Sequence, residues 1–169
     1  MPVNTVHQAI KGILDGLVVP GKAGVLHCYI TPPDPRDDPD PAIYIWPSRG
    51  NEHRQSVPRA SPGYQASFQS GWKEIVHTID GFLTWFGEDT DNQADSTFPA
   101  VVDLVMQALR NADDPMYAIT DPLTGQQSDL AGIGEKLSYE IGPVRATADQ
   151  RYLRYDALIT VTISEWFQA

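Results

Sequence analysis

Residues able to do chemistry are present, but their spacing matches no common catalytic or metal site. The single cysteine, Cys28, stands among apolar residues, which favours a small buried hydrophobe over a nucleophile. Two histidines, His27 and His77, fall on expected strands and could meet across a sheet, but no third metal ligand with a defined spacing follows. The full set of histidines is scattered: His7, His27, His53 and His77.

Phosphate-binding and hydrolase motifs are also missing from the sequence. It has no glycine-rich phosphate loop and no G-x-S-x-G nucleophile elbow. The acidic run at 34–40 lacks the glycine and closing glutamate of a calcium loop, which favours a solvated loop. We therefore expect no catalytic residue, no bound metal, no cofactor and no enzymatic activity.

The charge balance is strongly acidic, with 22 Asp and Glu against 12 Lys and Arg and a formal net charge of −10. Such a chain as a whole repels phosphate backbones, which argues against a general nucleic-acid binder. Two interpretations stay open: simple solubility, or a surface that nucleic acid passes without adhering. The 169 residues and 41% hydrophobic content predict one domain spanning 1–169 with its own core.

Apolar periodicity predicts two helices. The first covers residues 4–17, and the second extends from a cap at Ser96 to Asn111 with Pro99 in its first turn. The N-terminal apolar residues are spaced along one helix face and are not continuous. We therefore expect neither a signal peptide nor a membrane span.

Alternating and β-branched segments predict the strands. Residues 25–30 and 42–46 are expected to pair as an antiparallel, long-looped hairpin, and 72–86 forms a longer strand with a bulge or bend at Gly81. The remaining strands are expected at 117–121, 135–141 and 151–167, the last with one wet or partner-facing side. The predicted fold is α+β: a mostly antiparallel sheet of four to five strands with two amphipathic helices on one face, a β-hairpin and a long polar arm.

The arm covers residues 47–70, where glycine, proline and serine replace the periodic apolar residues. It contains three arginines, Arg49, Arg54 and Arg59, against one acid, Glu52. A basic arm on an acidic body is a plausible docking element. Large aromatic residues near strand ends, such as Trp166 and Phe167, are candidate anchors of a subunit interface.

Several segments together resemble tail terminator proteins of long-tailed (siphovirus-type) bacteriophages, particularly those infecting actinobacteria. The resemblance covers nearly the whole chain and rests on AIYIWP, FLTWFGED, FPAVVDLVMQALRNAD, ITDPLTG, GIGEKLSYEIGPV and RYLRYDALITVTISEWF. It implies a structural virion protein, assembled in the host cytoplasm, that forms a homo-oligomeric ring, a hexamer, in the tail or neck. Such a ring caps the tail tube and ends its polymerisation. It binds the tail-tube protein on one face and the head–tail connector protein on the other, while genome DNA passes through its lumen.

In that reading the arm is the expected contact with a neighbour or a tube subunit, its arginines facing acids of the next copy: Glu88, Asp89, Asp91 and Asp95. Other classes stay open: a head-closure or connector protein, a tail-tube subunit, or a small hydrolase or ligand-binding α+β domain. Mass in solution and the length of any polymer separate these classes.

Overall fold

A computed structural model describes residues 3–19, 24–30, 41–54, 72–88, 94–112, 117–120, 125, 127–146 and 152–168. Its elements follow in the order α1 (Val3–Leu14), β1 (His27–Tyr29), β2 (Ala42–Arg54), β3 (Trp72–Glu88), α2 (Ala94–Asn111), β4 (Tyr117–Thr120), β5 (Gln127–Ile141), β6 (Arg145–Ala146) and β7 (Tyr152–Gln168). The chain is therefore α+β, as the sequence predicts. None of the described helices is both long and apolar enough to cross a lipid bilayer.

All the strands among the described residues belong to one seven-stranded sheet with the order β1-β2-β3-β7-β5-β4, and β6 pairs with β7. Every pairing is antiparallel except that of β1 with β2, where His27 lies opposite Ala42 in a parallel register. The predicted antiparallel hairpin of 25–30 with 42–46 is therefore wrong. The sequence pattern identifies both strands, but strand direction depends on how the connection between them runs, and the pattern does not encode that.

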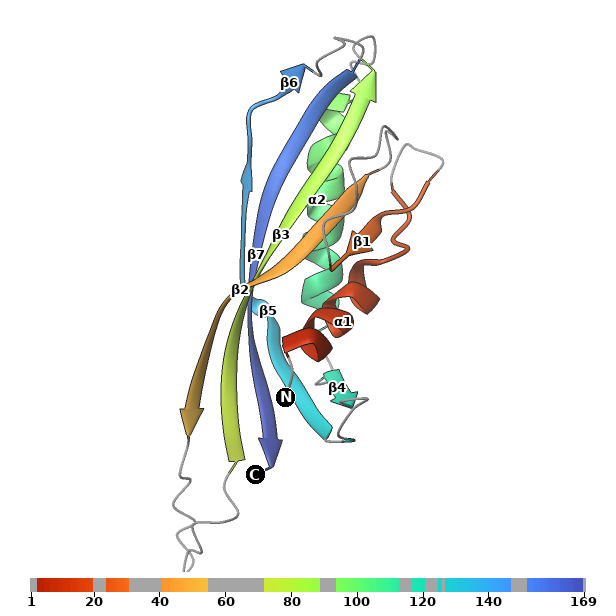
Figure 1. The fold of residues 1–169 in the computed structure, drawn as a ribbon. Coiled ribbons are helices and arrows are strands. Elements are labelled where there is room, and N and C mark those ends of the chain that lie inside the picture. Colours follow the sequence, from red (N-terminus) through yellow and green to blue (C-terminus); the bar gives the residue numbers. More distant parts are fainter. Residues whose placement is uncertain are drawn as a thin grey trace, which may run out of the picture.

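The two longest strands, β3 and β7, form the centre of the sheet. Each has 17 residues, and they pair without a register shift from Trp72 opposite Gln168 to Glu88 opposite Tyr152. Figure 1 shows the long strands crossing at a narrow waist, as a strong right-handed twist produces. The predicted bulge at Gly81 is wrong, because both neighbours of β3 keep their register there. Gly81 instead permits close packing, since a Cβ at this position would lie 3.1 Å from Cδ1 of Ile43.

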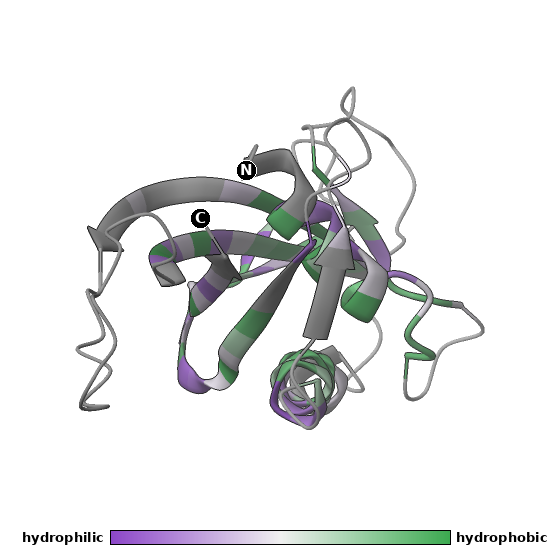
Figure 2. Ribbon diagram, turned by 90° about the horizontal axis from the view of Figure 1, so that it is seen from below, coloured by the Kyte–Doolittle hydropathy of each residue, from purple (hydrophilic) through white to green (hydrophobic). Residues whose placement is uncertain are grey.

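Both helices pack on the same face of the sheet. In α2, Phe98 and the apolar residues that follow at helical spacing are buried, and Figure 2 looks along this helix with its hydrophobic side toward the strands. Phe98 meets Trp85 and Tyr155 at ring-centroid distances of 6.1 and 5.5 Å. The odd-numbered residues of β7 from Tyr155 to Ile163 face the same core. The alternation predicted for this strand is confirmed.

Several boundaries differ from the sequence prediction. Helix α1 ends at Leu14, and Gly16 follows it with a φ of +84°, a conformation that glycine adopts without steric cost. Helix α2 begins at Ala94, so Ser96 lies inside the helix and is not its cap. The part of the predicted arm from 47 to 54 continues β2, with a register shift between Pro47 and Arg49. Pairing with β3 overrides the weak strand propensity of this stretch. The rest of the arm, residues 55–70, lies outside the described residues, as does the acidic run at 34–40.

Strand β5 is longer than predicted, since it begins at Gln127, and it contains a wide bulge. Its register against β7 shifts between Ala131 and Lys136, and Gly132 in this bulge has a φ of +73°. Helix α2 ends against the same bulge. A Cβ on Gly134 would lie 2.9 Å from the Cα of Arg110, so the helix backbone occupies the space that any side chain would need.

We predict that Gly134→Ala lowers the free energy of unfolding by about 1–3 kcal/mol, because the helix or the bulge must shift to admit a methyl group. Gly50→Ala is the matched control, since a Cβ there would have no atom within 4 Å. We expect that variant to stay within about 0.5 kcal/mol of the parent. Chemical denaturation of the three proteins measures both effects. Equal stability of the two variants would show that the helix does not press on the bulge.

Candidate functional site

The face of the sheet opposite the helices divides into a polar and an apolar region. In the polar region, hydroxyl groups of β7 donate to carboxylates of β3. Thr160 donates to Oδ1 of Asp80 at 2.7 Å, and Ser164 donates to Oε1 of Glu74 at 2.8 Å. These side chains satisfy one another across the strand pair. They form a polar surface, and their arrangement is not one that is suited to acid–base chemistry.

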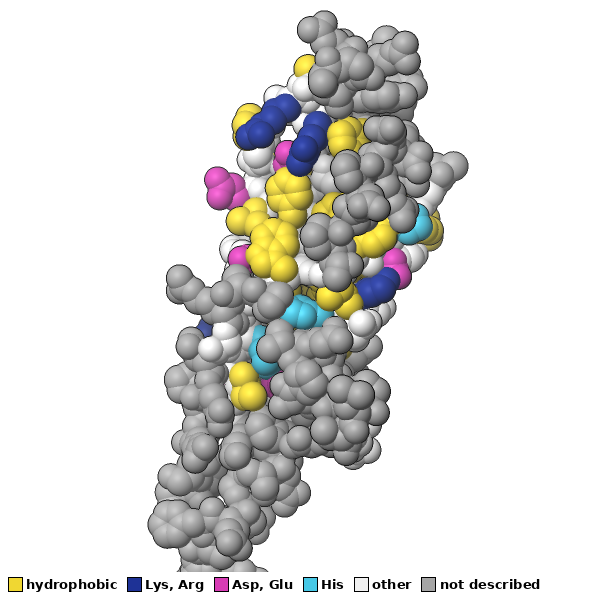
Figure 3. Space-filling model, in the orientation of Figure 1, with side chains coloured by type: hydrophobic (Ala, Val, Ile, Leu, Met, Phe, Trp, Pro, Cys, Tyr) yellow, Lys and Arg dark blue, Asp and Glu magenta, His cyan; other side chains and the backbone are white. Residues whose placement is uncertain are grey.

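The apolar region is a row of side chains in register across the strands. Tyr44 lies opposite Phe82, which lies opposite Leu158, and Tyr29 stacks on Tyr44 with ring centroids 5.5 Å apart. Trp46, on β2 beside this row, is 40% exposed and Leu158 is 37% exposed. Figure 3 shows hydrophobic side chains gathered on this face next to Lys or Arg side chains. We call Tyr29, Tyr44, Phe82 and Leu158 the aromatic row.

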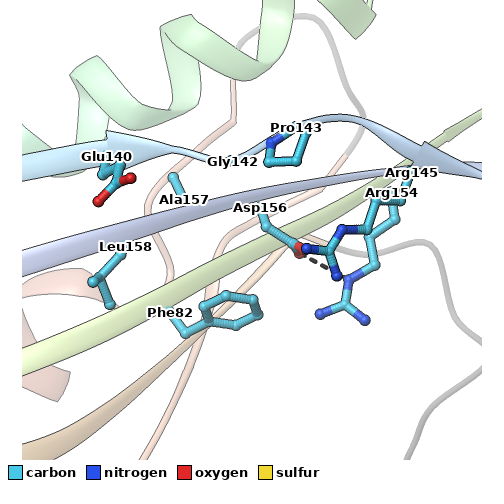
Figure 4. Close-up of a pocket in the computed structure, with 9 residues that line it drawn as sticks. All are labelled: Phe82, Glu140, Gly142, Pro143, Arg145, Arg154, Asp156, Ala157 and Leu158. Atoms are coloured by element: carbon cyan, nitrogen blue, oxygen red, sulfur yellow. Dashed lines mark hydrogen bonds and ion pairs between the residues drawn. The ribbon is translucent and has the colours of Figure 1, made fainter.

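A hollow of about 230 Å³ adjoins the aromatic row where β6 and β7 pair (Figure 4). Its lining combines apolar side chains with two arginines and two acids: Phe82, Glu140, Gly142, Pro143, Arg145, Arg154, Asp156, Ala157 and Leu158. Arg154 donates from Nε to Oδ1 of Asp156 at 2.8 Å, and its guanidinium lies 5.6 Å from the centre of the Phe82 ring. The hollow is open to solvent and can accept a side chain or a small anion.

An open edge of the sheet lies next to this hollow. Strand β4 pairs with β5 only between Gln127 and Leu130. Beyond the bulge, no described strand pairs with the outer edge of β5 from Lys136 to Ile141. This stretch and the residues after it expose large apolar side chains: Tyr139 at 53%, Ile141 at 44% and Val144 at 48%. We call residues 136–146 the open edge. Such an edge is a template for pairing with another chain.

A buried polar cluster lies between α1 and the sheet. His77 of β3 donates from Nε2 to Oε2 of Glu165 on β7 at 2.8 Å, and Glu165 is completely buried. His7 of α1 is 3% exposed, and its Nε2 has no hydrogen-bond partner within the described part of the chain. Burial lowers the pKa of His7, and the nearby His77 lowers it further. No substrate can reach these groups from solvent, so we assign them to the docking of α1.

Cys28 is buried on the edge strand β1, and burial raises the pKa of its thiol to about 12. The predicted role of a small buried hydrophobe is confirmed. Its backbone amide donates to Oδ1 of Asp15 at 3.0 Å. Asp15 also accepts from Lys11, and this bond, followed by the bond from Cys28, holds the pKa of Asp15 below its usual value. Asp15 thereby ties the end of α1 to β1.

The histidine pair suggested by the sequence does not form. His27 lies on the edge strand β1, whereas the histidine near His77 is His7, which comes from helix α1. Among the described residues, no three His, Cys, Asp or Glu side chains gather in a way that could bind a metal ion. Periodicity places His7 on the first helix, but only the packing of that helix against the sheet brings His7 near His77.

The predicted interface residues fall at two distant places. The backbones of Arg54 and Phe167 lie across β3 from one another, since both pair with Lys73, and Trp166 pairs with the adjacent Glu74. Glu88 lies at the other end of β3, opposite Tyr152. Arg49 belongs to β2, while Arg59 and Asp89 lie outside the described residues, as does Asp91.

Sequence reasoning missed the open edge and the hollow. The alternation of Leu137, Tyr139 and Ile141 is visible in the sequence and predicts a buried strand face. The helices do not cover this face beyond Leu137. Leu137 is half-buried, whereas Tyr139 and Ile141 are exposed. Only the position of α2 on the sheet shows that these side chains lack a partner within the described chain.

We predict that Glu165→Ala lowers the free energy of unfolding by about 3 kcal/mol, because it leaves His77 buried without its acceptor. The control is Glu140→Ala, which removes an exposed carboxylate from the same sheet and should cost less than about 0.5 kcal/mol. Thermal and urea denaturation of both variants test this. Similar losses in the two variants would contradict a structural role for the His77–Glu165 pair.

We also predict that stability falls as the pH decreases through the usual histidine pKa of 6.5. The pKa of His7 is lowered in the folded chain, so the unfolded chain binds a proton there that the folded chain resists. This contribution to stability is present above pH 6.5 and is lost below it. Urea titrations between about pH 7.5 and 5.5 should show a smaller decline in His7→Gln than in the parent. Identical slopes would exclude His7 as the source.

A scan against models of known protein families finds no match to this chain, and a search of curated proteins finds no relative.

Proposed function

We propose that this protein is a structural virion component, the tail terminator of a long-tailed bacteriophage. Copies of the chain associate into a ring, a hexamer, that caps the tail tube and ends its polymerisation. One face of the ring binds the tail-tube protein and the other binds the head–tail connector protein. In this proposal the chain has no enzymatic activity, and its site of action is the neck of the virion.

The observation that carries this proposal is the open edge. Tyr139 and Ile141 are exposed on a strand whose outer backbone groups from Lys136 to Ile141 have no partner among the described strands, and Val144 is exposed just after it. Association with another copy would bury these side chains and pair the free N–H and C=O groups in one step. If the edge pairs with a different surface of the neighbour, the contact is heterologous, and a heterologous contact closes into a ring when the rotation between copies permits it.

The charge of the chain supports the same function. Each copy has a formal net charge of −10, so a ring accumulates negative charge around its lumen. Phosphate backbones are repelled by such a wall, which lets DNA pass without adhering. The hydroxyl–carboxylate pairs of the polar region, Thr160 with Asp80 and Ser164 with Glu74, provide a surface of this kind.

The basic residues of β2 and the adjoining arm have a second role in the proposal. Arg49, Arg54 and Arg59 would contact acids of the next copy or of a tube subunit, with Trp166 and Phe167 as apolar anchors near the same end of the sheet. This contact is separate from the open edge, because Phe167 and Ile141 lie at opposite ends of the β7 pairing.

We predict that the parent chain forms ring-sized species whose fraction grows with protein concentration, measured by light scattering after gel filtration. The double variant Tyr139→Lys and Ile141→Lys should stay monomeric, because charges on the open edge oppose strand pairing. Val18→Lys is the matched control: Val18 is 74% exposed and lies away from the edge, in the segment after α1.

Electron microscopy of the same samples distinguishes the alternatives. Discrete rings that stop the growth of purified tail tubes are expected of a terminator, whereas long cylinders of this chain alone would identify a tube subunit. A parent chain that stays monomeric at every concentration and also leaves tube length unchanged would contradict the proposal.

A further inference from the structure

Two arginines face each other beside the hollow. Arg145 of β6 and Arg154 of β7 are directly opposite in an antiparallel pair. Like charges in this position oppose the pairing of their strands. An anion that binds between the two arginines would reduce this repulsion and stabilise the pairing of the strands.

The two arginines differ in their contacts with neighbouring side chains. Arg154 is held by the bond to Asp156 and by the Phe82 ring. Arg145 is exposed, and within the described part of the chain its side chain has no hydrogen bond or ion pair. The second acid of the hollow, Glu140, lies at the far end from Arg145 in Figure 4. This end of the hollow therefore holds two guanidinium groups and one carboxylate.

The walls of the hollow determine which kind of anion fits there. Phe82 and Pro143 are apolar and lie nearer the arginines, whereas Leu158 lies at the other end of the hollow with Glu140 (Figure 4). A ligand that fits must combine a carboxylate with hydrocarbon, as an aspartate or glutamate side chain does with its methylene groups. The planar guanidinium group of Arg145 can bind both oxygens of such a carboxylate.

We propose that the hollow receives an acidic side chain from a second copy of this chain, with its carboxylate between Arg145 and Arg154 and its methylene groups against Phe82. Charge complementarity favours this occupant, because each copy carries 22 acidic residues against 12 basic ones. The hollow is also continuous with the open edge, since Gly142, Pro143 and Arg145 belong to both. This inference rests on the proposed self-association and specifies the chemistry of one contact within it.

Sedimentation of the full-length chain at several concentrations tests the proposal. Arg145→Glu should weaken self-association by about 30-fold or more, since it places two carboxylates against each other. Arg145→Lys keeps the charge but loses the bidentate geometry, so a smaller loss is expected. Raising the NaCl concentration from about 0.05 to 0.5 M should weaken self-association of the parent more than self-association of the Arg145→Glu variant.

The matched control is Arg110→Glu, which makes the same charge reversal at an exposed position of α2, on the helix side of the sheet. It should associate like the parent. Circular dichroism melting verifies that each variant is folded. Because Arg145 is exposed on a two-residue strand, we expect it to be dispensable for folding.

The outcomes separate this inference from the proposed function. If the parent assembles and Arg145→Glu assembles equally well, the carboxylate contact is overturned while the ring proposal stands. If Arg145→Glu assembles normally but no longer retains a short double-stranded DNA that the parent retains, the arginines bind phosphate and the inference is also overturned. A parent that never self-associates overturns the contact, and it also contradicts the ring if the length of tail tubes is unchanged in its presence.

Discussion

The pairing of β3 with β7 is the interaction on which the rest of the structure depends. Both strands have 17 residues and pair along their whole length, so they form a twisted ribbon to which β2, β5 and β6 attach directly, while β1 and β4 attach through β2 and β5. Its odd-numbered face supplies the floor of the core, from His77 and Ile163 to Trp85 and Tyr155. Both helices pack on this face because it offers a continuous apolar surface.

On the opposite face and at the edges of the sheet, apolar side chains and backbone hydrogen-bonding groups remain available for contacts with another molecule. The two helices among the described residues do not cover the whole sheet, and β5 extends beyond α2 with Tyr139 and Ile141 exposed. The aromatic row adds apolar area on the other face of the same sheet. A monomer gains nothing by exposing these surfaces, whereas association would remove them from water. The physical case for self-association rests on this imbalance between the length of the sheet and its cover.

Charged groups serve two different purposes in this fold. Glu165 is fully buried and hydrogen-bonded to His77. Removing either residue would therefore leave the other buried without its hydrogen-bond partner. Arg145 and Arg154 are solvent-accessible neighbours of like charge, a disposition that a carboxylate from outside would stabilise. The first pair fixes how the chain folds upon itself. The second, by our inference, helps determine what the folded chain binds.

The sequence by itself determined the α+β class, both helices, the long strands and the alternation of β7, because apolar period and strand propensity are local properties. It also indicated that Cys28 is buried. Only the tertiary structure decided that β1 and β2 run parallel, that residues 47–54 extend β2, and that His7 meets His77. The open edge and the Arg145–Arg154 pair belong to the same group. Each depends on which segments distant in sequence become neighbours, and one-dimensional periodicity contains no information about that choice.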